Sequence, residues 1–273
     1  MVVYTAESQT NRLPEIIRSM IGGLRGTSYT SYRLFLKDVK SDYAKSKFGL
    51  IWDFIDPLVF AGIFYTLQKV GILSGGNVGM SYAVFVVYGF LLYQTFRESV
   101  LSPLKIMRSS RPILTHLKLP PECLLMSIFF RGIFNGGIRA IIMLGFSLVL
   151  GDFSLPGFIL FVILFPTIIL VGMSIGIFLA PFNTVYNDVG RVTEIMLNPL
   201  RFGTPVMYSL DQFPLINTIN PITQILDNLR SLATSCTITD PGLTAGKLTG
   251  FVVLMLVGWF IFHVSIPGLA ERA

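Results

Sequence analysis

Three arginines interrupt stretches that are otherwise apolar, and they are the side chains with the clearest potential for chemistry. Arg131, Arg139 and Arg201 each stand where a charge is costly unless it faces a bundle interior or a wet cavity. Few carboxylates accompany them, so they would suit a passage for an anionic or phosphate-bearing substrate. The alternative is that they extend to the membrane interface, or pair with Glu194 or a backbone carbonyl.

The second apolar stretch is rich in aromatic side chains. Most aromatics in membrane helices pack together or form belts at the interface. An aromatic face can also hold the apolar face of a sugar ring and let it slide, because stacking makes no fixed hydrogen bonds. Together with the three arginines, we therefore take as candidates for a channel or substrate surface Tyr82, Phe85, Tyr88, Tyr93 and Phe96.

Residues suited to catalysis or metal binding are scarce. Asp53 and Asp56 are three positions apart and so share a helical face, but a place at headgroup level, where a span begins, explains them better than an acid/base pair. His116 and His263 lie far apart, without Cys or carboxylates at metal-ligand spacing. We expect no catalytic residue, metal or cofactor in this chain.

Composition predicts a membrane protein. Of 273 residues, 52% are hydrophobic and 13% are charged, against roughly 25% charged in a typical soluble domain. The net charge of +6 comes from basic residues that crowd beside apolar stretches, as at a cytoplasmic membrane face, so nucleic acid is not an expected partner. The region around Gly242 to Lys247 lacks the GxxxxGK[ST] spacing of a phosphate-cradling loop, so the chain is not its own ATPase.

The apolar stretches predict an all-α integral membrane protein. A crossing helix needs about 20 mainly apolar residues, and six such stretches lie near 50–72, 82–103, 123–150, 155–181, 192–210 and 248–268. The fifth contains polar residues and prolines, so it would be broken or face the interior, and a five-span arrangement is the alternative. We treat residues 1–273 as one transmembrane domain, with the six-span bundle over 50–268.

The distribution of Lys and Arg predicts the orientation. The N-terminal 48 residues hold eight basic side chains, whereas the connectors 73–81 and 151–154 hold none. With Lys105, Arg108, Arg111 and Lys118 after the second span, this alternation places both chain ends and the segments 104–122 and 182–191 in the cytoplasm. The 211–247 loop then faces outward, and Cys123 and Cys236 lie on opposite sides of the membrane.

Two further segments predict short helices at the cytoplasmic side. Between a cytoplasmic N-terminal segment 1–28 and the first span, residues 29–48 place Tyr32, Phe35, Leu36, Val39 and Tyr43 on one stripe with cations beside it. This pattern is typical of a helix in the headgroup plane, the alternative being a solvated helix docked on another domain. The connector near 110–119 has an apolar centre, ends at consecutive prolines and suggests contact with a partner.

The order of these features resembles the type-2 ABC exporter permeases for polysaccharides. LFLKDVKSDYAKSKFGLIWDFIDPLVF is similar to that family's opening, in which a basic interfacial helix runs into a first span with Trp and Pro. The matching residues are Ser46, Gly49, Trp52 and Pro57. Asp53 and Asp56 add acid where many members have neutral or single acidic residues.

Three later segments carry the same resemblance. LTHLKLPPECLL is similar to the family's coupling segment, FNTVYNDVGRVTEIML to its turn into span five, and TPVMYSLDQFPLINTINPITQILDNLRSL to the re-entrant pair after that span. The matching residues of the turn are Asp188, Gly190 and Arg191. Those of the re-entrant region, which would form an outer gate over 211–240, are Pro205, Tyr208, Pro214, Asn220 and Pro221.

The resemblance implies a homodimer of six-helix subunits around a continuous channel, in the bacterial inner membrane. Two copies of a separate subunit would bind and hydrolyse Mg-ATP, and the cargo would be a lipid-linked glycan such as O antigen, capsule or teichoic acid. The ATPase would touch the interfacial helix and a coupling helix near 110–119. The residues implied for this contact are Pro112, Leu114, His116, Leu117, Lys118, Pro121, Glu122, Lys37 and Lys40.

Other functions stay open at this point. A membrane-embedded glycosyl or acyl transferase would need convergent acid, base or nucleophile residues on one side of the membrane. An exporter of another lipid or drug belongs to the same broad family. An ion-coupled transporter or channel would be expected to have inverted halves and carboxylates at mid-membrane depth, and neither is evident in the sequence.

Overall fold

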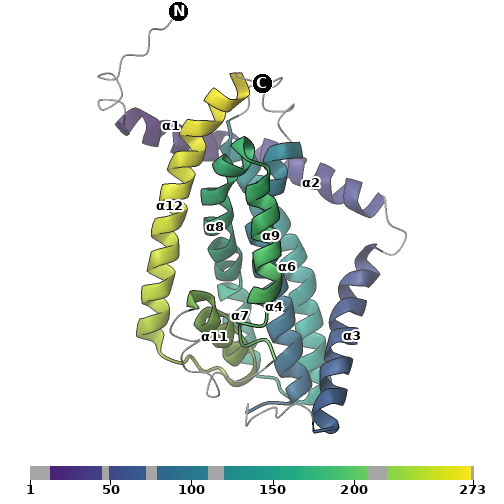
Figure 1. Cartoon of the computed structure of the whole chain (residues 1–273). Helices are drawn as coiled ribbons and strands as arrows, with labels where there is room; N and C mark the ends of the chain where they lie inside the picture. Colours follow the sequence, from purple (N-terminus) through teal and green to yellow (C-terminus); the bar gives the residue numbers. More distant parts are fainter. Residues whose placement is uncertain (1–12, 45–48, 72–78, 110–119, 208–219, 272–273) are drawn as a thin grey trace, which may run out of the picture.

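The computed structural model of the chain describes residues 13–44, 49–71, 79–109, 120–207 and 220–271. All the regular structure in these ranges is helical (Figure 1). The elements are α1 (Leu13–Gly26), α2 (Ser28–Ala44), α3 (Gly49–Lys69), α4 (Tyr82–Ser109), α6 (Glu122–Leu150), α7 (Leu155–Leu164), α8 (Pro166–Val185), α9 (Asp188–Leu200), α11 (Pro221–Ser235) and α12 (Pro241–Glu271).

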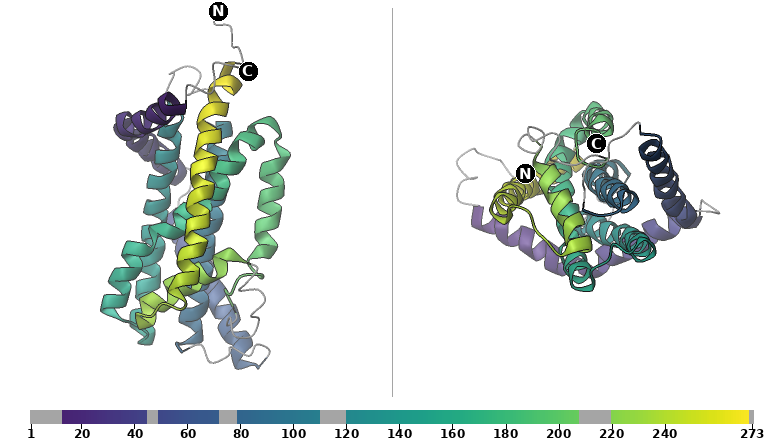
Figure 2. Two further views of the ribbon diagram at one scale, coloured as in Figure 1. Left: turned by 90° about the vertical axis from the view of Figure 1, so that its left-hand side faces the viewer. Right: turned by 90° about the horizontal axis from the view of Figure 1, so that it is seen from below.

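The helices form an upright bundle with two helices lying across one end. In Figure 1, α3, α4, α6, α8, α9 and α12 run side by side, and α1 and α2 cross them at the top. The end of α4, the start of α6, the α8–α9 turn and the end of α12 lie at this same end, which we call the basic end. The α6–α7 turn and α11 lie at the opposite end, called here the α11 end (Figures 1 and 2). The segments predicted to share one side of the membrane therefore share one end of the bundle.

Among the residues that the structure describes, three helical stretches are long and apolar enough to cross a membrane. They are Glu122–Leu150, Leu155–Val185 and Pro241–Ser265, which match the third, fourth and sixth predicted spans. The first and second predicted spans correspond to α3 and α4. The fifth corresponds to α9, which has 13 residues, fewer than the roughly 20 of a full crossing. Those three crossings stay predictions.

The fourth predicted span is divided between α7 and α8. Phe165 separates them, and Pro166 opens α8. Because proline has no N–H to donate to the preceding turn, the hydrogen-bond ladder is interrupted at this position. Ser154 caps the start of α7 by accepting a hydrogen bond from the Gly157 amide at 3.4 Å. The result is one nearly continuous helical path, Leu155–Val185, with a break in it.

A pair of glycines lets α8 lie directly against α4. Gly172 and Gly176 are four residues apart, so both face α4. A Cβ atom on Gly172 would lie 2.6 Å from the Ser99 Cβ and 2.7 Å from the Phe96 carbonyl oxygen. On Gly176 it would collide with the Val100 carbonyl oxygen. The close contact of these two helices therefore depends on small residues in α8.

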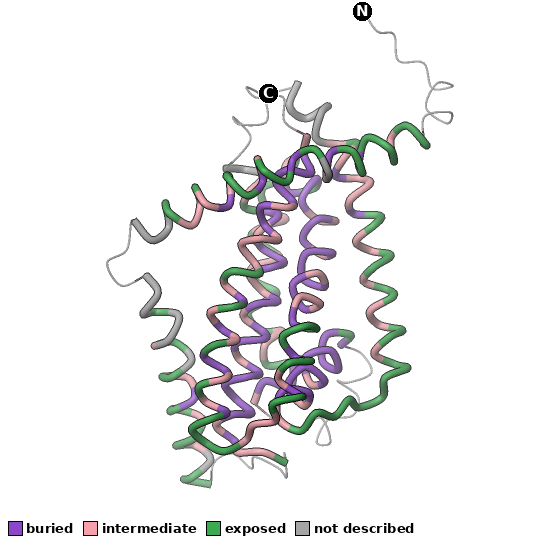
Figure 3. Tube along the Cα trace, turned by 180° about the vertical axis from the view of Figure 1, so that it is seen from behind, coloured by how far each residue is buried: buried purple, intermediate pink, exposed green. Residues whose placement is uncertain are grey.

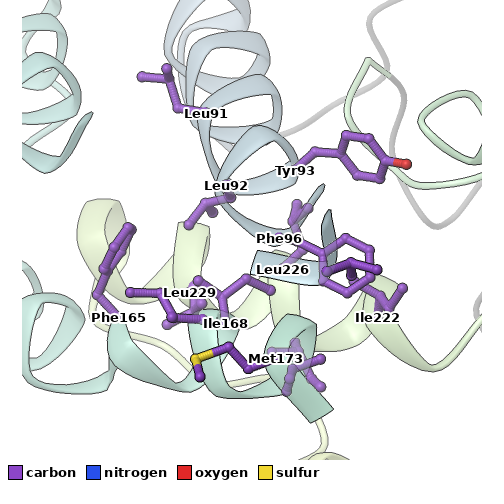
Figure 4. Packing of buried hydrophobic residues seen from close by; sticks show 14 of the residues in the cluster. Leu91, Leu92, Tyr93, Phe96, Phe165, Ile168, Met173, Ile222, Leu226 and Leu229 are labelled. Carbon is purple, nitrogen blue, oxygen red and sulfur yellow. The ribbon is translucent and has the colours of Figure 1, made fainter. Parts of the chain in front are cut away.

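The core lies where α4, α8 and α11 meet. Figure 4 shows side chains from these helices in contact, among them Phe96, Ile168 and Leu226, each fully buried. The tube in Figure 3 is buried along α4 and α8, whereas α12 is mostly exposed or intermediate. Outward-facing apolar residues of α12 and α3, such as Val252 and Leu58, leave more than half of their surface uncovered. Such outer helices are suited to contact with lipid tails.

Over the predicted interfacial segment 29–48, α2 shows a helix that runs from Ser28 to Ala44 in the described residues, and its place at the membrane interface stays a prediction. Two residues of the predicted stripe, Tyr32 and Phe35, pack against Phe130 of α6, with ring centroids 6.3 Å away in each case. The preceding helix α1 lies within the segment 1–28, for which no helix was predicted. Ile16, Met20 and Leu24 recur at helical spacing there, and this signal was available in the sequence.

Candidate functional site

A cavity of about 230 Å³ opens between α3, α4 and α9. It is lined by charged, amide and aromatic side chains together, among them Asp56, Gln94 and Asn198. Two of the residues predicted for a channel, Tyr93 and Arg201, line this cavity together with Asp56, which was predicted to lie at headgroup level. The Asp53 side chain lies outside the described residues. The arrangement offers cations and ring faces to one ligand.

Arg201 sits among aromatic rings at the end of α9. Its guanidinium carbon lies 5.2 Å from the Phe60 ring centroid, 5.9 Å from that of Phe90 and 5.4 Å from that of Phe202. Cation–π contacts of this kind hold a guanidinium while leaving its N–H groups available. Arg201 Nε is buried without a hydrogen-bond partner, so a donor at this site is unsatisfied.

Charged side chains form ion pairs on two sides of α4. On the side of the 230 Å³ cavity, Arg97 lines the cavity and donates from Nη2 to Glu194 Oε1 at 3.2 Å. On the other side of α4, Arg139 is buried, forms an ion pair with Glu98 and donates to Thr95 Oγ1 at 3.1 Å. The predicted pairing of an intramembrane arginine is thus found, but with Glu98, while Glu194 pairs with Arg97. Arg97 and Glu98, which stand next to each other in the second predicted span, were not singled out from the sequence.

The five predicted aromatic candidates are buried inside the subunit. The Tyr82 hydroxyl donates to the Met207 carbonyl at 2.9 Å, Tyr88 lies 2.8 Å from the Ser147 hydroxyl, and Tyr93 donates to the Leu197 carbonyl. Phe85 and Phe96 are at most 3% exposed. Their present role is packing, and Tyr93 is the member that also lines the smaller cavity. That they form a transport route stays a prediction.

A larger cavity of about 500 Å³ lies between α2, α4 and α6. Arg131 and Arg139, two of the predicted arginines, line it together with Arg97. Arg97 therefore borders both cavities, and a polar path surrounds α4 near the basic end.

The predicted gate residues that the structure describes lie together where α11 packs against the turn 201–207. Asn220 caps α11 by accepting from the Ile222 amide at 3.1 Å, and it donates to the Gly203 carbonyl at 3.0 Å. Pro205 is buried in the same turn, 201–207, and Pro221 opens α11. Tyr208 and Pro214 lie outside the described residues.

A buried arginine holds α11 against the turn 201–207. Arg230 is 0% exposed and donates to the Pro205 carbonyl at 3.1 Å and to Asp227 at 2.5 Å. Its guanidinium also lies 3.5 Å from the ring centroid of Phe85. Sequence reasoning missed this residue, because it lies in a segment predicted as an outer loop, where an arginine looks solvated.

At the basic end, the predicted coupling residue Glu122 is fully buried. Its Oε1 lies 2.5 Å from His263 Nδ1, and His263 Nε2 lies 2.9 Å from the Ser19 hydroxyl. This network joins the start of α6 to α12 and α1. Neither of the two cavities is lined by these three residues, and their contacts join helices.

The structure describes three of the other predicted coupling residues. Lys37 and Lys40 are exposed on α2, and Pro121 is buried at the start of α6. The predicted coupling helix itself lies outside the described residues, with Pro112, Leu114, His116, Leu117 and Lys118. That these residues touch an ATPase stays a prediction.

The turn between α8 and α9 is fastened by one side chain. Asn183 donates to the Leu104 carbonyl at 3.1 Å and accepts from the Gly190 amide at 2.7 Å. A Cβ on Gly190 would lie 2.7 Å from the Asn183 amide oxygen. This close contact gives a physical reason for glycine at a position that the family resemblance singled out.

Comparisons with known proteins agree with the geometry of a membrane permease. Residues 31–233 match a family model described as ABC-2 type transporter. The chain is 26% identical over 237 residues to the O-antigen export system permease protein RfbA of Klebsiella pneumoniae, covering 83% of this chain and 88% of that protein. For the RfbA of Myxococcus xanthus the identity is 22% over 252 residues, covering 87% and 93%. The polysialic acid transport protein KpsM of Escherichia coli is 19% identical over 198 residues, covering 70% and 74%.

Proposed function

We propose that this chain, which belongs to the ABC-2 type transporter family, is the channel-forming membrane subunit of an ATP-driven exporter of lipid-linked polysaccharide. The cargo class is a glycan of the O-antigen or capsule type. The observation that carries the proposal is the match to O-antigen export permeases over about nine-tenths of their length.

The smaller cavity supports this proposal chemically. Arg97 and Arg201 offer charged donors to a phosphate group, and planar guanidinium groups bind phosphate oxygens in a bidentate manner. Phe90 and Tyr93 offer ring faces to sugars beside them. A lipid-linked glycan presents both kinds of group, in the order of phosphate first and sugar chain after it.

Assembly as a homodimer would place the α3 and α9 faces of two subunits opposite each other. The outer side of α9 carries exposed Val192, Ile195 and Met196 beside exposed Asn198. An intramembrane helix with a mixed face of this kind is suited to a partner and a watery channel rather than to lipid alone. Two-fold assembly is also the commonest oligomeric state of proteins.

The energy source would be a separate subunit. The sequence has no phosphate-cradling loop, and the family comprises transport subunits. Two copies of an ABC ATPase would therefore bind to the basic end and hydrolyse Mg-ATP. Closure of the ATPase dimer would push α2 and the coupling segment. The Glu122–His263 pair would pass this movement from the start of α6 to α12.

The orientation follows from the basic side chains. The basic end would face the cytoplasm of a bacterium, with both chain ends there, in a multi-pass protein of the inner membrane. The α11 end would then face outward and form the outer gate, with Asn220 and Arg230 holding α11 closed against the 201–207 turn.

Affinity purification of the tagged full-length chain in mild detergent tests this proposal. Mass spectrometry should identify a stoichiometric ABC ATPase, and the purified complex should hydrolyse ATP. An isolated chain without ATPase across several detergents would contradict it. Combined Asp53→Asn and Asp56→Asn substitution should leave export largely intact, whereas abolished turnover with intact assembly would favour a membrane-embedded transferase.

A further inference from the structure

The larger cavity carries an excess of positive charge close to the basic end. About 500 Å³ in volume, it is bordered by α2, α4 and α6. Four of its lining residues are cations and two are carboxylates. Its remaining polar lining consists mainly of hydroxyl and amide side chains, among them Ser41, Ser127 and Asn135. A cavity with this lining offers hydrogen bonds and net attraction to an anion.

Two of the four lining cations form ion pairs. Glu98 is occupied by the buried Arg139, while Arg97 is turned toward Glu194 outside the cavity lining. Lys105 lines the cavity and has no ion-pair partner among the residues that the structure describes. The Nε donor of Arg97 is buried and without an acceptor. The excess of cations over carboxylates in the lining and its hydroxyl and amide groups suit the cavity to a group with acceptor oxygens.

An apolar path leads away from this cavity along α6. Phe134 is 37% exposed, about one helical turn along α6 from the lining residue Arg131. Ile141, two turns further toward the α11 end, is 65% exposed. A ligand that filled the cavity with an anionic head and covered this path with a hydrocarbon chain would satisfy both features.

We propose that the cavity between α2, α4 and α6 binds the phosphate headgroup of an anionic membrane lipid, with an acyl chain along the exposed face of α6. Lys105 and Arg131 contribute charge to the headgroup, and Ser127 and Asn135 contribute hydrogen bonds. The bound lipid fills the space below α2 and fastens that helix to the bundle. The site requires that the chain lies in a membrane, not that it exports a glycan, so the two proposals can fail separately.

Native mass spectrometry of the full-length chain in detergent tests the lipid site. The chain is titrated with dioleoylphosphatidylglycerol, with zwitterionic dioleoylphosphatidylcholine, and with inorganic phosphate as competitor. The variant K105Q/R131Q removes two cations of the lining, and R18Q/R33Q removes two exposed cations of the same end outside it. We expect phosphatidylglycerol binding to weaken about tenfold in the first variant and by less than about twofold in the second.

Three outcomes would overturn the proposal. Equal weakening in both variants would show diffuse attraction to the basic end. Equal retention of phosphatidylcholine would show that the headgroup charge is not recognised. Displacement of the lipid by inorganic phosphate alone would show a free-anion site without a role for the acyl chain. Circular dichroism and the midpoint of thermal unfolding of both variants, measured in parallel, establish that any loss is not a loss of folding.

Discussion

The carboxylate of Glu122, at the first residue of α6, lies 2.5 Å from Nδ1 of His263 near the end of α12. The two residues are 141 positions apart in the sequence. The carboxylate is fully buried at the N-terminus of α6, where the helix dipole favours negative charge. Its second oxygen lies against α1, since a Cβ on Gly23 would be 2.7 Å from it. One side chain thus joins three helices at the end where an ATPase would bind.

Removal of this carboxylate should loosen the basic end. Glu122→Ala leaves His263 without its partner, so we expect a loss of about 1–3 kcal/mol in the free energy of unfolding, whereas Glu122→Gln keeps the shape and one acceptor and should cost less. Thermal unfolding in detergent measures the difference. In the assembled exporter, Glu122→Ala should retain ATP hydrolysis but lose export. Glu15→Ala, at an exposed position of α1, is the control, and an equal effect there would contradict the assignment.

Close contact between α4 and α8 should make Gly172 intolerant of side chains. Gly172→Leu forces atoms into the space that Ser99 and the Phe96 carbonyl occupy, and overpacking of this kind costs about 1–3 kcal/mol or more. Gly145→Leu is the matched control, because a Cβ there would meet nothing within 4 Å. We expect Gly172→Leu to reduce the yield of monodisperse protein in gel filtration. Equal yields would mean that α4 and α8 do not pack as described.

Much of the helical layout could be predicted from the sequence, because apolar length and the distribution of Lys and Arg act locally along the chain. The stripe of α2 and the stretches of α6, α8 and α12 are of this kind. Partners could not be predicted, because Arg139 and Glu98 are 41 positions apart and meet only when α4 and α6 pack. Arg230 was missed for the same reason, since its burial depends on Phe85 and Pro205.

Arg230 should be essential for the packing of α11 against the turn 201–207. The loss of stability on its removal should be partly compensated by a substitution at Asp227. Arg230→Met leaves Asp227 without its partner, and breaking a buried ion pair in this way costs about 3–5 kcal/mol. Asp227→Asn in the same chain removes the uncompensated charge and should restore part of that loss. Thermal unfolding of the single and double variants measures the coupling. Arg191→Met, at an exposed position of α9, should change little. Additive losses from Arg230 and Asp227 would contradict the pairing.

Arg201 should affect transport more than folding. Arg201→Gln removes the charge held over Phe60 and Phe90, and we expect export to fall roughly fivefold to tenfold, in line with about 1–2 kcal/mol for a desolvated cation–π site. Arg201→Lys should recover part of the activity, because it keeps the charge but not the planar fork. The amount of glycan that reaches the outer side, per amount of permease in the membrane, is the measurement. Normal export by Arg201→Gln would remove this cavity from the route.

The two cysteines test the orientation of the chain without any introduced label site. Cys236 is exposed at the α11 end, after the last turn of α11, whereas Cys123 is buried at the basic end. If the α11 end faces outward, a membrane-impermeant maleimide added to spheroplasts should label the wild-type chain and Cys123→Ser equally, and Cys236→Ser not at all. Labelling of Cys236 only after the membrane is permeabilised would place the α11 end in the cytoplasm. That result would reverse the proposed orientation, and with it the assignment of α11 as the outer gate.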